Sequence, residues 1–159
     1  PDHVFHANRG VAGIDGCTST ALGWAAATGR ATWLVTGDVA FHYDANALLT
    51  DPVPSALHIV VMNNGGGGIF RWLPGTQHPD LFERHFETPP NRTVESQARA
   101  MGARHFLATS EAELREALSG VIRTKGPTVL EVQTPAVQNA AVLADYLAAF
   151  RHTSTSALS

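Results

Sequence analysis

The stretch TGDVAFHYDANAL, Thr36 to Leu48, decides the fold. The apolar run before it, residues 31–35 (ATWLV), is typical of a buried strand and ends abruptly at Gly37 and Asp38. A second apolar run, residues 57–62 (LHIVVM), ends in a similar way at Asn63 and Asn64, which lead into four glycines. Ligands of α/β sheets bind beyond the carboxyl ends of the strands. We therefore expect Asp38 and Asn64 to face one crevice.

Strands and helices alternate along the rest of the chain, which predicts an α/β fold with a doubly wound, mostly parallel sheet and helices on both faces. Gly29 and Gly102 are placed as helix stops, and Ser110 with Glu113 forms a capping box. We expect strands at residues 3–7, 31–35, 57–62, 104–109 and 128–134, and helices at 17–28, 43–50, 93–101, 110–124 and 136–150.

The remaining segments lack a clear period. Residues 69–92 carry Pro, Gly, Asn and aromatic side chains, and we expect them to form a long ordered flap. Residues 151–159 are predicted to be a disordered tail, which leaves one domain over residues 1–150. The absence of an initiator Met suggests that the domain was cut from a larger protein.

Composition limits the classes of function. The net charge of −3 does not favour nucleic acid as a partner, and no apolar run approaches the length of a membrane span. The single cysteine fits a reducing compartment, so we expect a cytoplasmic protein. Charged residues make up 16% of the chain, against about 25% in ordinary soluble domains. Either a subunit face is covered by a partner, or an Ala-rich sequence has few charges by chance.

Asp38 and Asn64 offer hard oxygen ligands, the kind that Mg²⁺ and Ca²⁺ prefer. Two ligands are too few for an octahedral ion, but a backbone carbonyl in the glycine run and a phosphate-bearing ligand would add more. The Gly37-Asp38 turn also opens a helix, whose free N–H groups favour an anion. An equally weighted alternative is that Asp38 only caps this helix and that Asn63 and Asn64 only make a turn.

Other motifs point to no chemistry. The glycine run Gly65–Gly68 is not followed by the Lys-Ser/Thr pair of a phosphate loop, and residues 10–16 (GVAGIDG) have the wrong spacing for a nicotinamide site. The histidines contain no helical zinc pair, and surface histidines are the favoured interpretation. We read Asp15 as the cap of the following helix. The roles of Arg71, Arg84, Arg92 and the flap over residues 74–92 stay open.

Three stretches carry a family resemblance. Gly37-Asp38-Val39 followed by Asn63-Asn64 resembles the thiamin-diphosphate signature, although the third residue is usually Gly. The stretches NRGVAGIDGCTSTALG, GDVAFHYDANAL and NNGGGGIFRWLPG resemble the 2-succinyl-5-enolpyruvyl-6-hydroxy-3-cyclohexene-1-carboxylate synthases of menaquinone biosynthesis, with Ala7 where that family has Ser. The resemblance covers about His6 to Phe150 and implies the C-terminal, thiamin-diphosphate-binding domain of a three-domain enzyme.

The resemblance implies roles for individual residues. The cofactors would be thiamin diphosphate and Mg²⁺ or Mn²⁺. The implied metal ligands are Asp38, Asn64 and the carbonyl of Gly66. The implied cofactor contacts are Ala12, Ile14, Gly37, Asp38, Val39, Ala40 and Asn64, with Ile14 as the wedge that bends the cofactor. The implied substrate contacts are Arg9, Ile69, Phe70 and Leu73, with Arg9 pairing a carboxylate.

The resemblance also implies a reaction. Enzymes of this family decarboxylate 2-oxoglutarate and add the resulting succinyl carbanion to isochorismate. The activating glutamate belongs to the N-terminal domain of a second subunit, so we expect a homodimer or homotetramer, and no catalytic residue and no activity in this chain alone. The alternatives are another thiamin-diphosphate enzyme, such as a 2-oxoacid decarboxylase or an acetolactate-type synthase, and a non-catalytic doubly wound domain that binds nucleotides.

Overall fold

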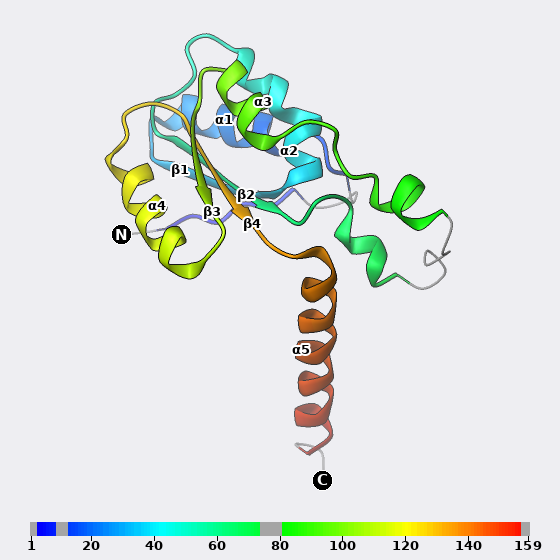
Figure 1. The fold of residues 1–159 in the computed structure, drawn as a ribbon. Helices are drawn as coiled ribbons and strands as arrows, with labels where there is room; N and C mark the ends of the chain where they lie inside the picture. Colours follow the sequence, from blue (N-terminus) through cyan, green and yellow to red (C-terminus); the bar gives the residue numbers. More distant parts are fainter. Residues whose placement is uncertain (1–2, 9–12, 74–80, 157–159) are drawn as a thin grey trace.

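The computed structural model describes residues 3–8, 13–73 and 81–156. Its centre is a four-stranded sheet in the order β1-β2-β4-β3 (Figure 1). All three pairings are parallel. The strands are β1 (Thr32–Gly37), β2 (Leu57–Asn63), β3 (Arg104–Ala108) and β4 (Thr128–Gln133). The predicted α/β class with a parallel sheet is confirmed.

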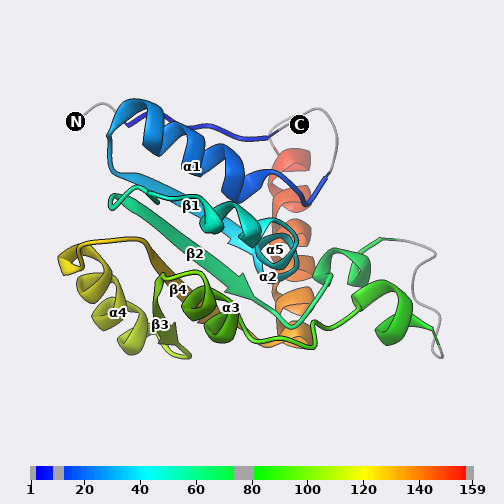
Figure 2. The same ribbon diagram turned by 90° about the horizontal axis from the view of Figure 1, so that it is seen from above.

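Helices cover both faces of the sheet, as expected (Figures 1 and 2). The helices α1 (Cys17–Thr28), α2 (Asp38–Asp44) and α3 (Val94–Ala100) pack on one face, and α4 (Glu111–Arg123) packs on the other. Alternate residues of the central strands divide between the two cores. In β4, Val129 packs with the first group of helices and Leu130 packs with α4. The continuous apolar runs are explained by this double burial.

Helix α2 begins at Asp38, directly after β1, which confirms that the Gly37-Asp38 turn opens a helix. The start at residue 43, which we expected for the regular helical segment, is five residues too late. Helix α2 continues as a 3-10 helix, Ala45–Leu49, so that Phe41, Ala45 and Leu48 are buried on one side. This spacing is helical, but the polar residues Asp38 and His42 conceal it in the sequence. The polypeptide therefore turns from strand to helix with no intervening loop.

Two terminal segments also differ from expectation. Residues 3–8 form no strand, and the predicted strand over residues 3–7 is wrong. His6 packs against Trp24 of α1 with the rings tilted and 4.2 Å between their centres, while Phe5 remains 92% exposed. At the other end, α5 (Ala136–Ser156) projects away from the sheet and continues past Phe150, where we expected the ordered part to end (Figure 1).

The flap contains two short helical segments, a 3-10 helix at Gly68–Arg71 and a π-helix at Phe82–Glu87. Residues 74–80, which the prediction also included, lie outside the described residues. Among residues 3–8, 13–73 and 81–156, no helix is long and apolar enough to cross a membrane.

The N-terminus of α4 confirms the predicted cap in a modified form. The Ser110 hydroxyl accepts a hydrogen bond from the N–H of Glu113. The carboxylate of Glu113, however, bonds the N–H and the hydroxyl of Thr109, at 2.7 and 2.6 Å, instead of the N–H of Ser110. These Thr109 bonds lower the pKa of the Glu113 side chain.

Ser110→Ala removes this cap and is expected to lower the free energy of unfolding by about 1 kcal/mol. The matched control is Ser119→Ala. The Ser119 hydroxyl bonds the carbonyl of Arg115 within the same helix, so its loss to Ala should be neutral or slightly stabilising. Urea denaturation of both variants measures the difference. Equal effects would show that the Ser110 cap does not contribute.

Candidate functional site

The structure brings the side chains of Asp38 and Asn64 together at the carboxyl ends of neighbouring strands. Asp38 is the first residue of α2 after β1, and Asn64 directly follows β2. With its amide nitrogen turned toward them, Asn64 donates to Oδ1 of Asp38 at 3.0 Å and to the carbonyl of Gly66 at 2.9 Å. Turning the same amide by 180° would bring three oxygen atoms to one point. A carboxylate, an amide and a backbone carbonyl are a donor set suited to Mg²⁺.

The Asp38 carboxylate is buried with an unused acceptor. The residue is 1% exposed, and its Oδ2 has no hydrogen-bond partner among the described residues. Burial raises the pKa of Asp38, although the N–H groups of Val39, Asp38 itself and Gly66, and the charge of His42, act in the opposite direction. A buried, partly unsatisfied carboxylate is costly to keep. A divalent cation beside Oδ2 would satisfy it, so the residues present fit a metal ion.

Close contacts leave no room for a side chain at three positions of the glycine run, Gly66, Gly67 and Gly68. A Cβ at Gly66, whose φ is +142°, would lie 2.4 Å from the carbonyl oxygen of Glu87. The neighbouring Gly67 donates its N–H to that same oxygen at 2.7 Å. A Cβ at Gly68 would lie 2.0 Å from the amide of Asn64. The run is therefore a packed turn that holds Asn64, and not an ordinary flexible loop.

Glu87 anchors this turn from the flap. Its carboxylate is buried and forms a two-pronged pair with Arg71, at 2.7 Å from Nε and 2.6 Å from Nη2. The pair joins the 3-10 segment after the glycine turn to the end of the π-helix. Glu87 was missed in the sequence because its contact with the turn is made by a backbone carbonyl, which leaves no residue-type signal.

A second missed residue is Asp44. Its two carboxylate oxygens accept from the N–H and the hydroxyl of Ser19, both at 2.7 Å, and so cap α1 from α2. The prediction that Asp15 caps α1 is wrong, since Gly16 is the N-cap residue and no side chain caps it locally. Asp44 thereby ties the start of α1 to the helix that carries Asp38.

The other predicted contacts lie around the turn. Ile69, Phe70 and Leu73 follow the glycine run, with Phe70 packed on Phe86 and the other two exposed. A cavity of about 310 Å³ lies between this segment and α5, lined by Arg71, Trp72, Leu143 and Leu147. Gly37, Val39 and Ala40 surround Asp38 at the start of α2.

Of the remaining predicted residues, the structure describes some and leaves others outside the described residues. Ile14 is 41% exposed ahead of α1. Arg9 and Ala12 lie outside the described residues. Arg84 and Arg92 are exposed. No group of three or more His, Cys, Asp or Glu residues that could hold a metal ion occurs within residues 3–8, 13–73 and 81–156.

These features define an α/β domain with a candidate ligand site at the carboxyl edge of its parallel sheet. Comparison with known families gives the particular class. The chain belongs to the family described as "Thiamine pyrophosphate enzyme, C-terminal TPP binding domain", which it matches over residues 1–132.

The similar curated proteins carry the name predicted from the motifs, 2-succinyl-5-enolpyruvyl-6-hydroxy-3-cyclohexene-1-carboxylate synthase. The chain is 45% identical to the Flavobacterium psychrophilum protein over 87% of the chain and 25% of that protein. It is 44% identical to the Porphyromonas gingivalis protein, over 87% of the chain and 24% of the relative. It is 42% identical to the Desulfotalea psychrophila protein, over 82% of the chain and 24% of that protein. The chain thus spans about a quarter of the length of these relatives.

Asp38→Asn is expected to raise the unfolding temperature of the metal-free protein at neutral pH. The folded-state pKa of Asp38 is raised above the usual value of 3.8, so ionisation of this side chain destabilises the fold. The advantage of the variant should be largest above the raised pKa and should disappear as acid protonates Asp38 in the wild type. Thermal melts at several pH values in EDTA measure it.

The matched control is Asp44→Asn in the same helix. Both oxygens of the Asp44 carboxylate accept from Ser19 in the first turn of α1, and an uncharged amide would make weaker bonds there, so the variant should lower the unfolding temperature. A lower unfolding temperature for Asp38→Asn as well would contradict the assignment of Asp38 as a destabilising buried acid.

Gly66→Ala is expected to destabilise more than Gly65→Ala. Both glycines have positive φ, which costs an L-residue about 1–2 kcal/mol. A Cβ at Gly65 meets open space, whereas one at Gly66 meets the Glu87 backbone, and such overpacking adds about 1–3 kcal/mol. Chemical denaturation gives both free energies of unfolding. Identical losses would mean that the Gly66–Glu87 approach is not tight in solution.

Proposed function

We propose that this chain is the cofactor-binding domain of a thiamin-diphosphate- and Mg²⁺-dependent synthase. The reaction would be the decarboxylation of 2-oxoglutarate and transfer of the remaining four-carbon unit to isochorismate, in menaquinone biosynthesis. The observation that carries the proposal is the meeting of Asp38 Oδ1, Asn64 and the Gly66 carbonyl, beside a buried Asp38 Oδ2 that has no hydrogen-bond partner among the described residues. The names of the relatives, at 42–45% identity over more than four fifths of the chain, support the choice of reaction.

The residues of this chain would hold the metal and the diphosphate. Asp38 and Asn64 supply side-chain oxygens, and Gly66 supplies its carbonyl, to Mg²⁺ or Mn²⁺. Diphosphate oxygens complete the shell of such ions. Gly37, Val39 and Ala40, where α2 begins, would contact the diphosphate. Thiamin diphosphate, when bound, supplies the electron sink that decarboxylation needs.

Apolar residues of the chain would form part of the reaction chamber. Ile69, Phe70 and Leu73 follow the ligand turn directly, and we assign them to the wall around the reacting carbon. Ile14, exposed ahead of α1, would support the cofactor by apolar contact. Ala12 accepts from its amino group through a backbone carbonyl, and Arg9 pairs a substrate carboxylate. Exclusion of water by these groups strengthens each polar contact inside the site.

The site would be completed by a second subunit, whose N-terminal domain supplies the activating glutamate. The described glutamates on α4, such as Glu111 and Glu116, are exposed on the side of the sheet away from Asp38. A homodimer or homotetramer is therefore the active form, and this chain alone is inactive.

The complete natural protein should melt at a higher temperature with thiamin diphosphate and Mg²⁺ together. Ligand at about 100 times its dissociation constant contributes about 2.7 kcal/mol. Asp38→Ala should abolish the increase, because it removes the central metal ligand. The wild type should consume isochorismate in the presence of 2-oxoglutarate and leave pyruvate unchanged.

Each alternative function gives a different result in the same assays. Turnover of pyruvate without use of isochorismate would identify a different thiamin-diphosphate enzyme. Nucleotide binding that needs no Mg²⁺ and is unchanged in Asp38→Ala would identify a non-catalytic domain. No stabilisation by the cofactors in the wild type would refute the proposal.

A further inference from the structure

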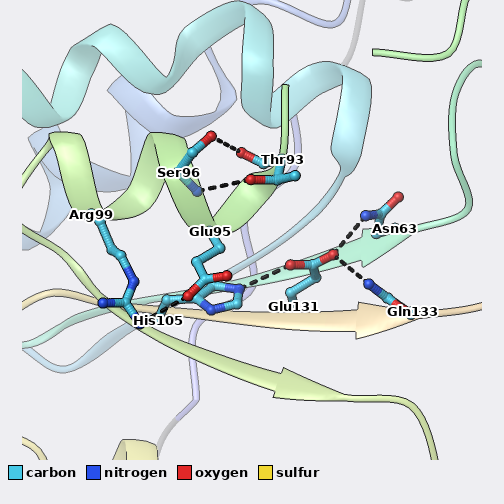
Figure 3. A network of polar contacts seen from close by, with 8 residues as sticks. All are labelled: Asn63, Thr93, Glu95, Ser96, Arg99, His105, Glu131 and Gln133. Carbon is cyan, nitrogen blue, oxygen red and sulfur yellow. Dashed lines mark hydrogen bonds and ion pairs between the residues drawn. The ribbon is translucent and has the colours of Figure 1, made fainter. Parts of the chain in front are cut away.

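Glu131 is a buried carboxylate in the middle of the sheet that the proposed chemistry does not use. It lies on β4, between β2 and β3, and is 4% exposed. Its Oε1 accepts from Nδ2 of Asn63 at 2.7 Å and from Nε2 of Gln133 at 3.2 Å. Its Oε2 lies 2.9 Å from Nε2 of His105, a ring that is also buried (Figure 3). The carboxylate thus links three neighbouring strands.

The link from Glu131 continues through Asn63 to the ligand turn. While Nδ2 of Asn63 donates to Glu131, its Oδ1 accepts from the N–H of Gly65 at 3.0 Å. The carbonyl of Asn63 accepts from the N–H of Thr134 at 2.8 Å. Asn64 lies between Asn63 and Gly65. The backbone on both sides of Asn64 is therefore held, on one side by the sheet and on the other by the Asn63 amide.

The direction of the Asn63 amide is set by Glu131. An amide can present either its oxygen or its nitrogen to Gly65, and only the oxygen accepts from an N–H. A carboxylate presents acceptors only, so it requires the nitrogen of Asn63 to face it. His105 occupies the other carboxylate oxygen, which keeps Glu131 from turning away. The buried network therefore selects one orientation of Asn63.

We propose that Glu131 is a positioning residue that, through Asn63, fixes the turn presenting Asn64 and Gly66 to the metal. The inference rests on the proposed function for its ligand. Partners that orient metal-site residues typically contribute about 10–100-fold to metal affinity. Glu131 is not itself a ligand of the metal, and it acts on the turn only through its hydrogen bond to Asn63.

The decisive test first turns the Asn63 amide into a carboxylate and then turns the Glu131 carboxylate into an amide. Asn63→Asp, measured at a pH high enough to ionise both groups, leaves two carboxylates facing each other without the amide donor between them, so the turn should shift and Mn²⁺ should bind about 10–100-fold more weakly. Electrostatic attraction alone predicts the opposite, because a new negative charge beside the site favours a cation. Adding Glu131→Gln restores a donor–acceptor pair, in which Gln donates to Asp, Asp still accepts from Gly65, and the Gln oxygen accepts from His105. The double variant should recover to within about threefold of the wild type.

The matched control is Gln133→Ala, which removes the other donor to the same Glu131 oxygen without touching the turn. Its Mn²⁺ affinity should stay within about threefold of the wild type. Dissociation constants are measured by electron paramagnetic resonance of free Mn²⁺, with saturating thiamin diphosphate, on the complete natural protein. Hydrogen exchange of residues 63–68, followed by mass spectrometry without cofactors, reports the turn directly and should be faster only in Asn63→Asp.

The outcomes separate the two proposals. Unchanged or tighter binding in Asn63→Asp, or a double variant as weak as the single one, overturns the positioning role. If the wild type binds no Mn²⁺ with thiamin diphosphate, the proposed function fails. Hydrogen exchange still decides the positioning role in that case, since equal exchange in the wild type and Asn63→Asp would overturn it.

Discussion

The architecture depends on one costly choice, a carboxylate buried where strand β1 passes directly into helix α2. Asp38 keeps one oxygen without a hydrogen-bond partner among the described residues, and burial raises its pKa. A fold selected only for stability would place an amide or an apolar group there. Natural proteins keep such costs at functional sites. The parallel pairing of β1 with β2 is what lets Asn64 reach this carboxylate.

Around this carboxylate, the glycine turn is held by three separate parts of the chain. The Glu87 carbonyl holds Gly67, and Arg71 in turn holds the Glu87 side chain. Glu131 holds the turn from the sheet through Asn63. Glycines at this point reduce local stiffness, so rigidity has to come from these outside contacts. Accurate placement of site residues depends on such supporting contacts.

Features of the fold and of the candidate site could be predicted from the sequence where neighbouring residues in the chain determine them. The apolar runs predicted β1, β2 and β4, because strands covered on both faces need continuous apolar residues. The proximity of Asp38 and Asn64 followed from parallel strands ending at one edge. The helical segment expected from residue 43 began too late because the first turn of α2 carries the polar residues Asp38 and His42, although the Gly37-Asp38 turn had indicated a helix start. Capping of α1 by Asp44, and the support from Glu87 and Glu131, depend on contacts between distant residues that no single sequence window contains.

The uneven cover of the sheet bears on the low charge fraction. Helix α4 lies over β3 and β4, whereas Trp33 and Val35 of the edge strand β1 point to that same side and remain 42% and 68% exposed. The Trp33 ring packs against His58 of β2 in a tilted arrangement, 4.7 Å between ring centres, and β1 is an edge strand of the described sheet. Proteins usually cover or disrupt such edges. Exposed large apolar side chains also occur elsewhere in the described residues, for example Phe5, Ile122 and Tyr146, so Trp33 and Val35 are one part of a wider pattern. Covering Trp33 and Val35 with another surface would remove this apolar area from water, which is what the explanation of a covered subunit face expects.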